Sequence, residues 1–62
     1  MNTFTKLLIQ ELQQEVEILQ EVENASTEKI LESINSDARI RNIKNQNIEL
    51  YNTIIKEVIQ IS

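Results

Sequence analysis

Five carboxylates spaced along the N-terminal third are the first side chains in this sequence whose type and spacing could do chemistry. They are Glu11, Glu15, Glu17, Glu21 and Glu23. Carboxylates that point inward from helices can hold paired iron ions, but such sites also need Glu-x-x-His pairs. The sequence has no His, and it lacks the Gly-bearing acidic loop that binds calcium. We therefore predict a solvated acidic face without a metal, and Glu15, Glu17 and Glu21 are a candidate surface for a basic protein.

A second candidate is the segment from Ala38 to Asn47, where Arg39, Arg41 and Lys44 alternate with isoleucines and amides. A helix with this pattern could place its cations along phosphates and its amides along base edges. The same cations could instead face the acidic N-terminal helix of the folded chain, or water. Three cations in a chain of net charge −4 are a weak electrostatic footprint, so the sequence favours the second interpretation. Nucleic-acid binding stays open as an alternative, because a dimer would double the patch.

The other polar side chains do not form a catalytic pair. Without His or Cys, the chain has neither a base that normally titrates near neutral pH nor a thiolate. The serines, at positions 26, 33, 36 and 62, have no evident base to activate them. Tyr51 is expected in a core or an interface, with its hydroxyl at the edge. We predict that the protein is not an enzyme and needs no cofactor.

The elements that position these side chains are predicted to be helices. The 62 residues include no Gly and no Pro, which are the residues that most often interrupt helices. Hydrophobic residues make up 40% of the chain, so it has enough apolar side chains for a small core. We predict one all-α domain over residues 1–62. The sequence shows no signal-peptide pattern and no apolar run of about 18 residues, so we expect a cytoplasmic protein without a membrane span.

Helical spacing predicts segments over residues 3–23, 27–35 and 37–61, of which the last two could be continuous. Ser26 or Thr27 is suited to cap the second segment, and Asp37 to begin the third. Two arrangements fit this pattern: a helical hairpin and a short three-helix unit. Either one is expected to assemble into a homodimeric helical bundle, since 62 residues make a marginal domain alone.

The apolar face is wider than one partner helix would cover. Leu12, Val16 and Leu19 form a short seam with coiled-coil spacing, while the pairs Ile54/Val58 and Ile55/Ile59 form two neighbouring stripes. The predicted interface between copies comprises Leu12, Val16, Leu19, Tyr51, Ile54, Ile55, Val58 and Ile59. Asn47 is expected either in that seam, where a buried amide can fix the register, or at its exposed rim.

Three functional hypotheses follow. The leading one is a non-enzymatic, regulatory protein–protein interaction module that forms a homo-oligomer. The second is a small acidic inhibitor or antitoxin-like regulator, of plasmid or phage type, that docks on a basic nucleic-acid-handling protein. The third is weak RNA or DNA binding through Arg39, Arg41 and Lys44 on a dimer.

Overall fold

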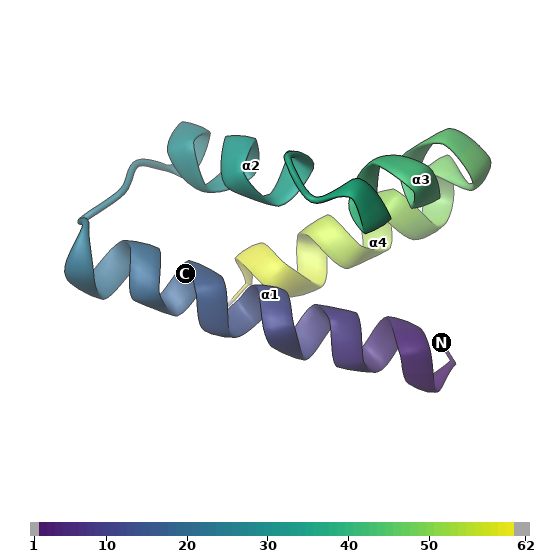
Figure 1. Ribbon diagram of the computed structural model, residues 1–62, viewed down its shortest axis with the longest axis horizontal. Helices are drawn as coiled ribbons and strands as arrows, with labels where there is room; N and C mark the ends of the chain where they lie inside the picture. The colour runs from purple at the N-terminus through teal and green to yellow at the C-terminus, as the bar shows by residue number, and fades with distance from the viewer. Residues whose placement is uncertain (1, 61–62) are drawn as a thin grey trace.

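The computed structural model describes residues 2–60, and all regular structure in this range is helical (Figure 1). The four helices are α1 (Thr3–Val22), α2 (Thr27–Asn35), α3 (Ala38–Gln46) and α4 (Ile48–Ile59). The all-α prediction is confirmed over this range, which contains no strand.

Each helix begins at a side chain that accepts a backbone hydrogen bond. Asn2 Oδ1 accepts from the Thr5 amide at 2.9 Å, and Ser26 Oγ accepts from the Lys29 amide at 3.2 Å. Asp37 Oδ1 accepts from the Arg39 amide at 2.8 Å. The first turn of a helix leaves its amides without intrahelical partners, so these caps set where the helices start. Of the two candidate caps for the second segment, Ser26 is the one used, and the predicted start at Asp37 is confirmed.

The predicted helix over 37–61 is corrected to two helices, because the chain breaks at Asn47. This residue has φ −153° and ψ 90°, outside the helical region, and its Oδ1 accepts from the Leu50 amide at 3.1 Å. A short amide side chain competes for backbone donors in this way, which makes Asn a better cap than a helix-interior residue. Asn47 was expected either in the apolar seam or at its exposed rim. It is exposed, so it lies at the rim. Ile61, the last residue of the predicted helix, lies outside the described residues.

The turn after α1 uses Asn24 in place of a glycine. Its φ of +50° is left-handed, a conformation that Asn tolerates better than most residues with a side chain. The following Ala25 amide donates to Leu19 O at 3.0 Å, which satisfies a carbonyl at the end of α1. The chain can therefore reverse direction here although it has no Gly.

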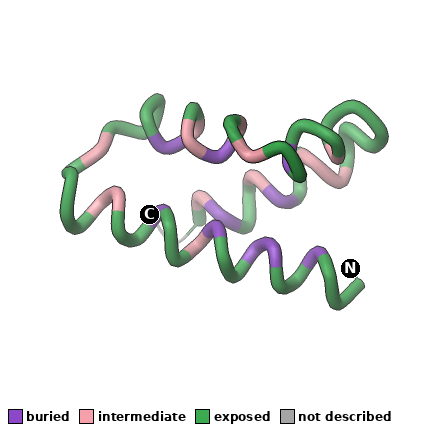
Figure 2. Tube along the Cα trace, viewed as in Figure 1, coloured by how far each residue is buried: buried purple, intermediate pink, exposed green. Residues whose placement is uncertain are grey.

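All four helices contribute to one aliphatic core (Figure 2). Its buried members are Leu8, Ile9, Leu12 and Val16 of α1, Ile30 and Ile34 of α2, Ile40 of α3, and Ile54 and Val58 of α4. The main packing contacts join α1 to α4 and α3 to α4, and α2 packs on α1 and α3.

The chain path places α2 and α4 antiparallel to each other. In Figure 1, α1 runs toward the turn at Asn24, α2 and α3 return along the opposite side, and α4 runs back between them. None of the helices in residues 2–60 has both the length and the apolarity to cross a membrane.

Candidate protein-interaction surface

Half of the predicted interface residues lie instead in the core of the single chain. The exposed fractions of Leu12, Val16, Ile54 and Val58 are 1%, 0%, 0% and 0%. We therefore correct the assignment of these four residues from interface to core, because a fully buried side chain has no surface left to contact a second chain. The physical reason is that α1 and α4 pack on each other within one copy.

The other four predicted residues, Leu19, Tyr51, Ile55 and Ile59, are half-buried. They pack against the core with one side and keep surface on the other. On α4 this division follows from helical spacing. Ile54 and Val58 lie one turn apart and face inward, whereas Ile55 and Ile59 are each one residue further along and are rotated toward solvent. The broad apolar face of α4 is thus only partly covered within one chain.

A hydrogen bond links this partly covered side of α4 to α2. Tyr51 Oη donates to Asn35 Oδ1 at 2.6 Å. One turn back along α2 from Asn35 lies Leu31, and one turn onward along α4 from Tyr51 lies Ile55, although α2 and α4 do not pack closely on each other. Leu31 is half-buried, as are Tyr51, Ile55 and Ile59 on α4. We name Leu31, Tyr51, Ile55 and Ile59 the α2–α4 strip.

Sequence reasoning missed Leu31 as part of this surface. The stripe of Ile30, Leu31 and Ile34 looks uniformly apolar, but only Ile30 and Ile34 are buried, at 3% and 2% exposure. A usable signal was Asn35, one turn beyond Leu31, because a polar residue at that spacing marks the edge of a buried face.

The α2–α4 strip has cations beyond its Tyr51 end. Lys44 Nζ lies 5.2 Å from the centroid of the Tyr51 ring, a cation–π distance. Arg41 Nη1 donates to Ser36 O at 2.7 Å, which holds the guanidinium over the end of α2. Together with Asn35 and Asn45, the two cations line one shallow depression.

Arg39 does not belong to this group, so the three predicted cations do not form one patch. Residues two apart on a helix point to different sides, and Arg39 reaches α1, where its Nη1 lies 2.8 Å from Glu11 Oε2. Its Nη2 lies 2.8 Å from Asp37 Oδ2. The side-chain hydrogen bond from Arg39 lowers the pKa of Asp37, and the hydrogen bonds to Asp37 and then Glu11 raise the pKa of Arg39. Of the two positions expected for the cations, the acidic first helix or water, Arg39 takes the first, whereas Arg41 and Lys44 are exposed.

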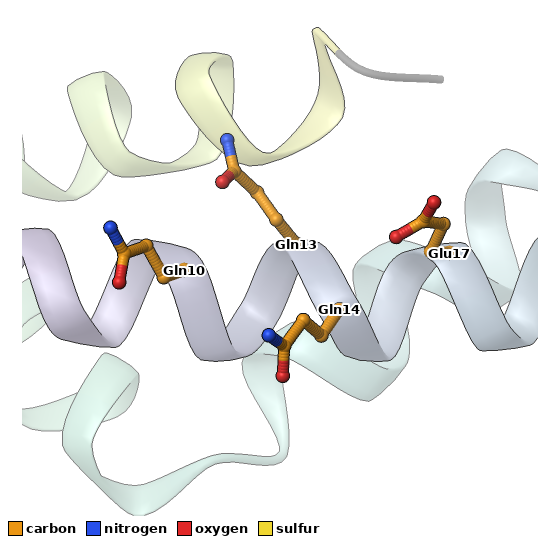
Figure 3. A pocket seen from close by; sticks show the side chains of 4 residues that line it. All are labelled: Gln10, Gln13, Gln14 and Glu17. Atoms are coloured by element: carbon orange, nitrogen blue, oxygen red, sulfur yellow. The ribbon is translucent and has the colours of Figure 1, made fainter.

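The predicted acidic surface is divided in a similar way. Glu15 accepts a hydrogen bond from Ser33 Oγ at 2.9 Å, so it helps to join α1 to α2. Glu17 and Glu21 are exposed. Glu17 borders a shallow hollow on the outer side of α1 that is otherwise lined by Gln10, Gln13 and Gln14 (Figure 3).

This hollow is not a ligand pocket by its chemistry. Gln13 points toward α4 in Figure 3, and its Nε2 donates to Glu57 O at 3.2 Å, while Gln14 points away from α4. The lining side chains are three amides and a carboxylate, without the hydrophobic and aromatic residues that usually line a small-molecule site. Among residues 2–60, no group of three or more Asp and Glu side chains is arranged to hold a metal ion.

Several large apolar side chains outside the predicted interface are exposed. They are Phe4, Leu7, Ile18, Val22 and Ile48. Ile48 lies at the start of α4, seven residues before Ile55, and so it extends the partly covered side of that helix. The other four belong to α1, where they lie in two pairs at the two ends of the helix.

The sequence matches no protein-family model and no curated protein, and no solved structure matches it.

Proposed function

We propose that this protein is a non-enzymatic helical interaction module that binds another protein chain through the α2–α4 strip. The observation that carries this proposal is the contrast along α4. Ile54 and Val58 are fully buried, whereas the neighbouring Ile55 and Ile59 keep surface. A helix on a single-chain core usually shows polar residues beyond its buried stripe, and here the next stripe is isoleucine.

The energetics favour a protein partner at this strip. Fully burying an Ile or Leu side chain stabilises an assembly by about 1.5–3 kcal/mol, and half-buried side chains supply part of that. The strip lies on two helices that are already formed and joined by the Tyr51–Asn35 hydrogen bond, so little ordering opposes binding. Tyr is also a residue type enriched among the strongest contacts of interfaces.

A photo-crosslinking amino acid at position 52 tests the proposal. Asn52 is exposed and lies on α4 three residues before Ile55, at the border of the strip. We expect this probe to crosslink to a protein in cells that make the chain. The matched control is the same probe at Gln14, on the outer side of α1, where we expect no adduct. Equal labelling at both positions, or none at position 52, would overturn the proposal.

A second candidate function, a small acidic regulator of a basic protein, has its own observation. Glu17 and Glu21 are exposed on α1, and Ile18 and Val22 beside them are 58% and 78% exposed. Carboxylates around an apolar pair complement a basic surface with apolar residues. Binding to such a partner should weaken as salt increases and be lost when Glu17 and Glu21 are both changed to Gln. Binding that is indifferent to both changes contradicts this candidate.

The third hypothesis, nucleic-acid binding, has the least support. Arg39 is engaged by two carboxylates, which leaves Arg41 and Lys44 as the cations that share a side of α3. Two cations on a chain of net charge −4 supply little attraction for a phosphate backbone.

A further inference from the structure

The shallow depression between the end of α2 and α3 is lined by side chains that suit an anion. It is formed by Asn35 of α2 and by Arg41, Lys44 and Asn45 of α3. The three residues of α3 share one side of that helix, because Lys44 and Asn45 follow Arg41 by three and four positions. All four side chains carry N–H donors, and none of them carries a negative charge.

The two cations of this depression are not neutralised within the described chain. Among residues 2–60, neither Arg41 nor Lys44 forms an ion pair with a carboxylate, whereas Arg39 forms two. Asp37 is the acidic residue nearest to Arg41 in the sequence, and it is one of the two partners of Arg39. Two positive charges on the same side of α3 are therefore left to be balanced from outside the chain.

Two exposed carboxylates, Glu32 and Glu49, flank the depression in the sequence without lining it. Glu49 lies two residues before Tyr51, so it points to a different side of α4 from the ring that Lys44 contacts. Glu32 lies three residues before Asn35 on α2, and it makes no ion pair with either cation. An anion in the depression would thus contact cations and amides.

Contacts within the chain hold these groups in place and leave donors for a ligand. Arg41 Nη1 donates to Ser36 O at 2.7 Å, which uses one of the five N–H donors of the guanidinium. Lys44 Nζ lies 5.2 Å from the centroid of the Tyr51 ring. Because Asn35 Oδ1 accepts from Tyr51 Oη at 2.6 Å, the amide group of Asn35 is left to donate. Groups that are already positioned lose less entropy when a ligand binds.

We propose that this depression binds one phosphate dianion, either free or at the end of a small ester. A dianion balances the charges of both Arg41 and Lys44, whereas a carboxylate balances one. The planar guanidinium can meet two phosphate oxygens, and the ammonium and amide groups can meet the others. A nucleic-acid backbone would instead need cations along a row of phosphates. The site lies beyond the apolar strip, so this inference does not depend on the proposed function.

Nuclear magnetic resonance of the isotope-labelled natural chain tests the proposal. The probes are inorganic phosphate, O-phosphoserine and acetate, each at the same ionic strength and at about pH 7.5, where phosphate groups are mainly doubly charged. With a phosphate probe we expect saturable shifts of the side-chain signals of Asn35, Arg41 and Asn45, and a dissociation constant of about 1 mM or lower. Acetate should bind about tenfold more weakly or worse.

The two phosphate probes separate the sources of the ligand. Saturation by inorganic phosphate alone assigns the site to the free ion, and saturation by O-phosphoserine alone assigns it to an ester. Either result, or saturation by both, supports the proposal. Shifts that do not saturate with either probe, or that are equal with acetate, overturn it.

Matched variants show whether the depression or the net charge attracts the anion. Arg41→Gln with Lys44→Gln should raise the dissociation constant for phosphate about tenfold or more. The control is Lys29→Gln with Lys56→Gln, which removes the same charge from exposed positions that do not line the depression. We expect this control to bind phosphate as the natural chain does. Equal losses in the two variants would overturn the proposed site.

A single substitution tests the role of the amide of Asn35. Asn35→Asp keeps an acceptor for Tyr51 Oη but replaces the donor with a carboxylate oxygen, so we expect phosphate binding to be lost. Circular dichroism checks that each variant stays helical. Should the double Gln variant unfold, Arg41→Lys takes its place, because it keeps the charge and removes the guanidinium fork, and we expect several-fold weaker binding. Natural affinity in folded Asn35→Asp or Arg41→Lys contradicts the proposal.

Discussion

Tyr51 on α4 donates a hydrogen bond to Asn35 on α2, with an Oη–Oδ1 distance of 2.6 Å. The two residues are sixteen positions apart in the sequence and belong to helices that do not pack closely on each other. Both side chains are half-buried, and the bond ties the C-terminal end of α2 to α4. This hydrogen bond is a direct link between the two helices that carry the α2–α4 strip.

Tyr51→Phe should destabilise the monomer by about 0.5–1.5 kcal/mol, because Asn35 loses a partner in a partly dry position. The ring remains, so the packing on the core and the contact with Lys44 are kept. Urea denaturation followed by circular dichroism measures the change. Thr53→Ala, which removes an exposed hydroxyl on α4, is the control and should have a much smaller effect. Equal stability of Tyr51→Phe and the natural chain would show that the hydrogen bond contributes nothing.

Asn47→Ala should lower the free energy of unfolding by about 1 kcal/mol, since the Leu50 amide loses its cap. Asn47→Asp keeps an acceptor at the helix start and should retain the natural stability. Chemical denaturation of the three proteins provides the comparison. If the Ala variant is more stable and more helical than the natural chain, then α3 and α4 have fused and the break at Asn47 was not favoured by the core.

Ile54→Ala should cost about 2–5 kcal/mol, because it leaves a cavity at a position of 0% exposure. A domain of this size has little stability to spare, so we expect the variant to be largely unfolded at room temperature. Val22→Ala removes apolar atoms at a position of 78% exposure and should change stability by about 0.5 kcal/mol or less. Thermal melts of both variants test the contrast, and similar melting temperatures would contradict the core assignment of Ile54.

The Asp37–Arg39 pair should make stability fall in acid. The pKa of Asp37 is lowered from 3.8 in the folded chain, chiefly by the hydrogen bond from Arg39. A lowered folded-state pKa means that the stabilisation is fully present above pH 3.8 and is lost as the pH falls through the lower folded value. Asp37→Asn keeps an N-cap acceptor but removes the charge.

The difference in unfolding free energy between the natural chain and Asp37→Asn isolates this contribution from the other carboxylates. We expect that difference to be constant from pH 7 to about pH 5 and to shrink below the ordinary pKa of this aspartate, 3.8. A difference that stays constant down to pH 2 would mean that the folded chain does not favour the ionised form of Asp37.

The starts of α2 and α3 could be read from the sequence because capping is local chemistry. Ser26 and Asp37 accept hydrogen bonds from amides two or three residues away, so their neighbours in the chain are enough to predict them. The absence of Gly and Pro, with aliphatic residues at helical spacing, likewise determined the all-α class. Asn47 obeys the same local rule, but the helical spacing of isoleucines on both of its sides masked the cap.

Tertiary structure alone decided which apolar and charged side chains remain available for binding. Ile54 and Ile55 are adjacent and chemically identical, yet only Ile54 is fully buried, because burial depends on the direction from which α1 and α3 approach α4. The ion pair that removes Arg39 from the basic patch likewise joins residues 28 positions apart. Spacing along a helix determines which side chains share a side, whereas the packing of the other helices determines which of those sides faces water.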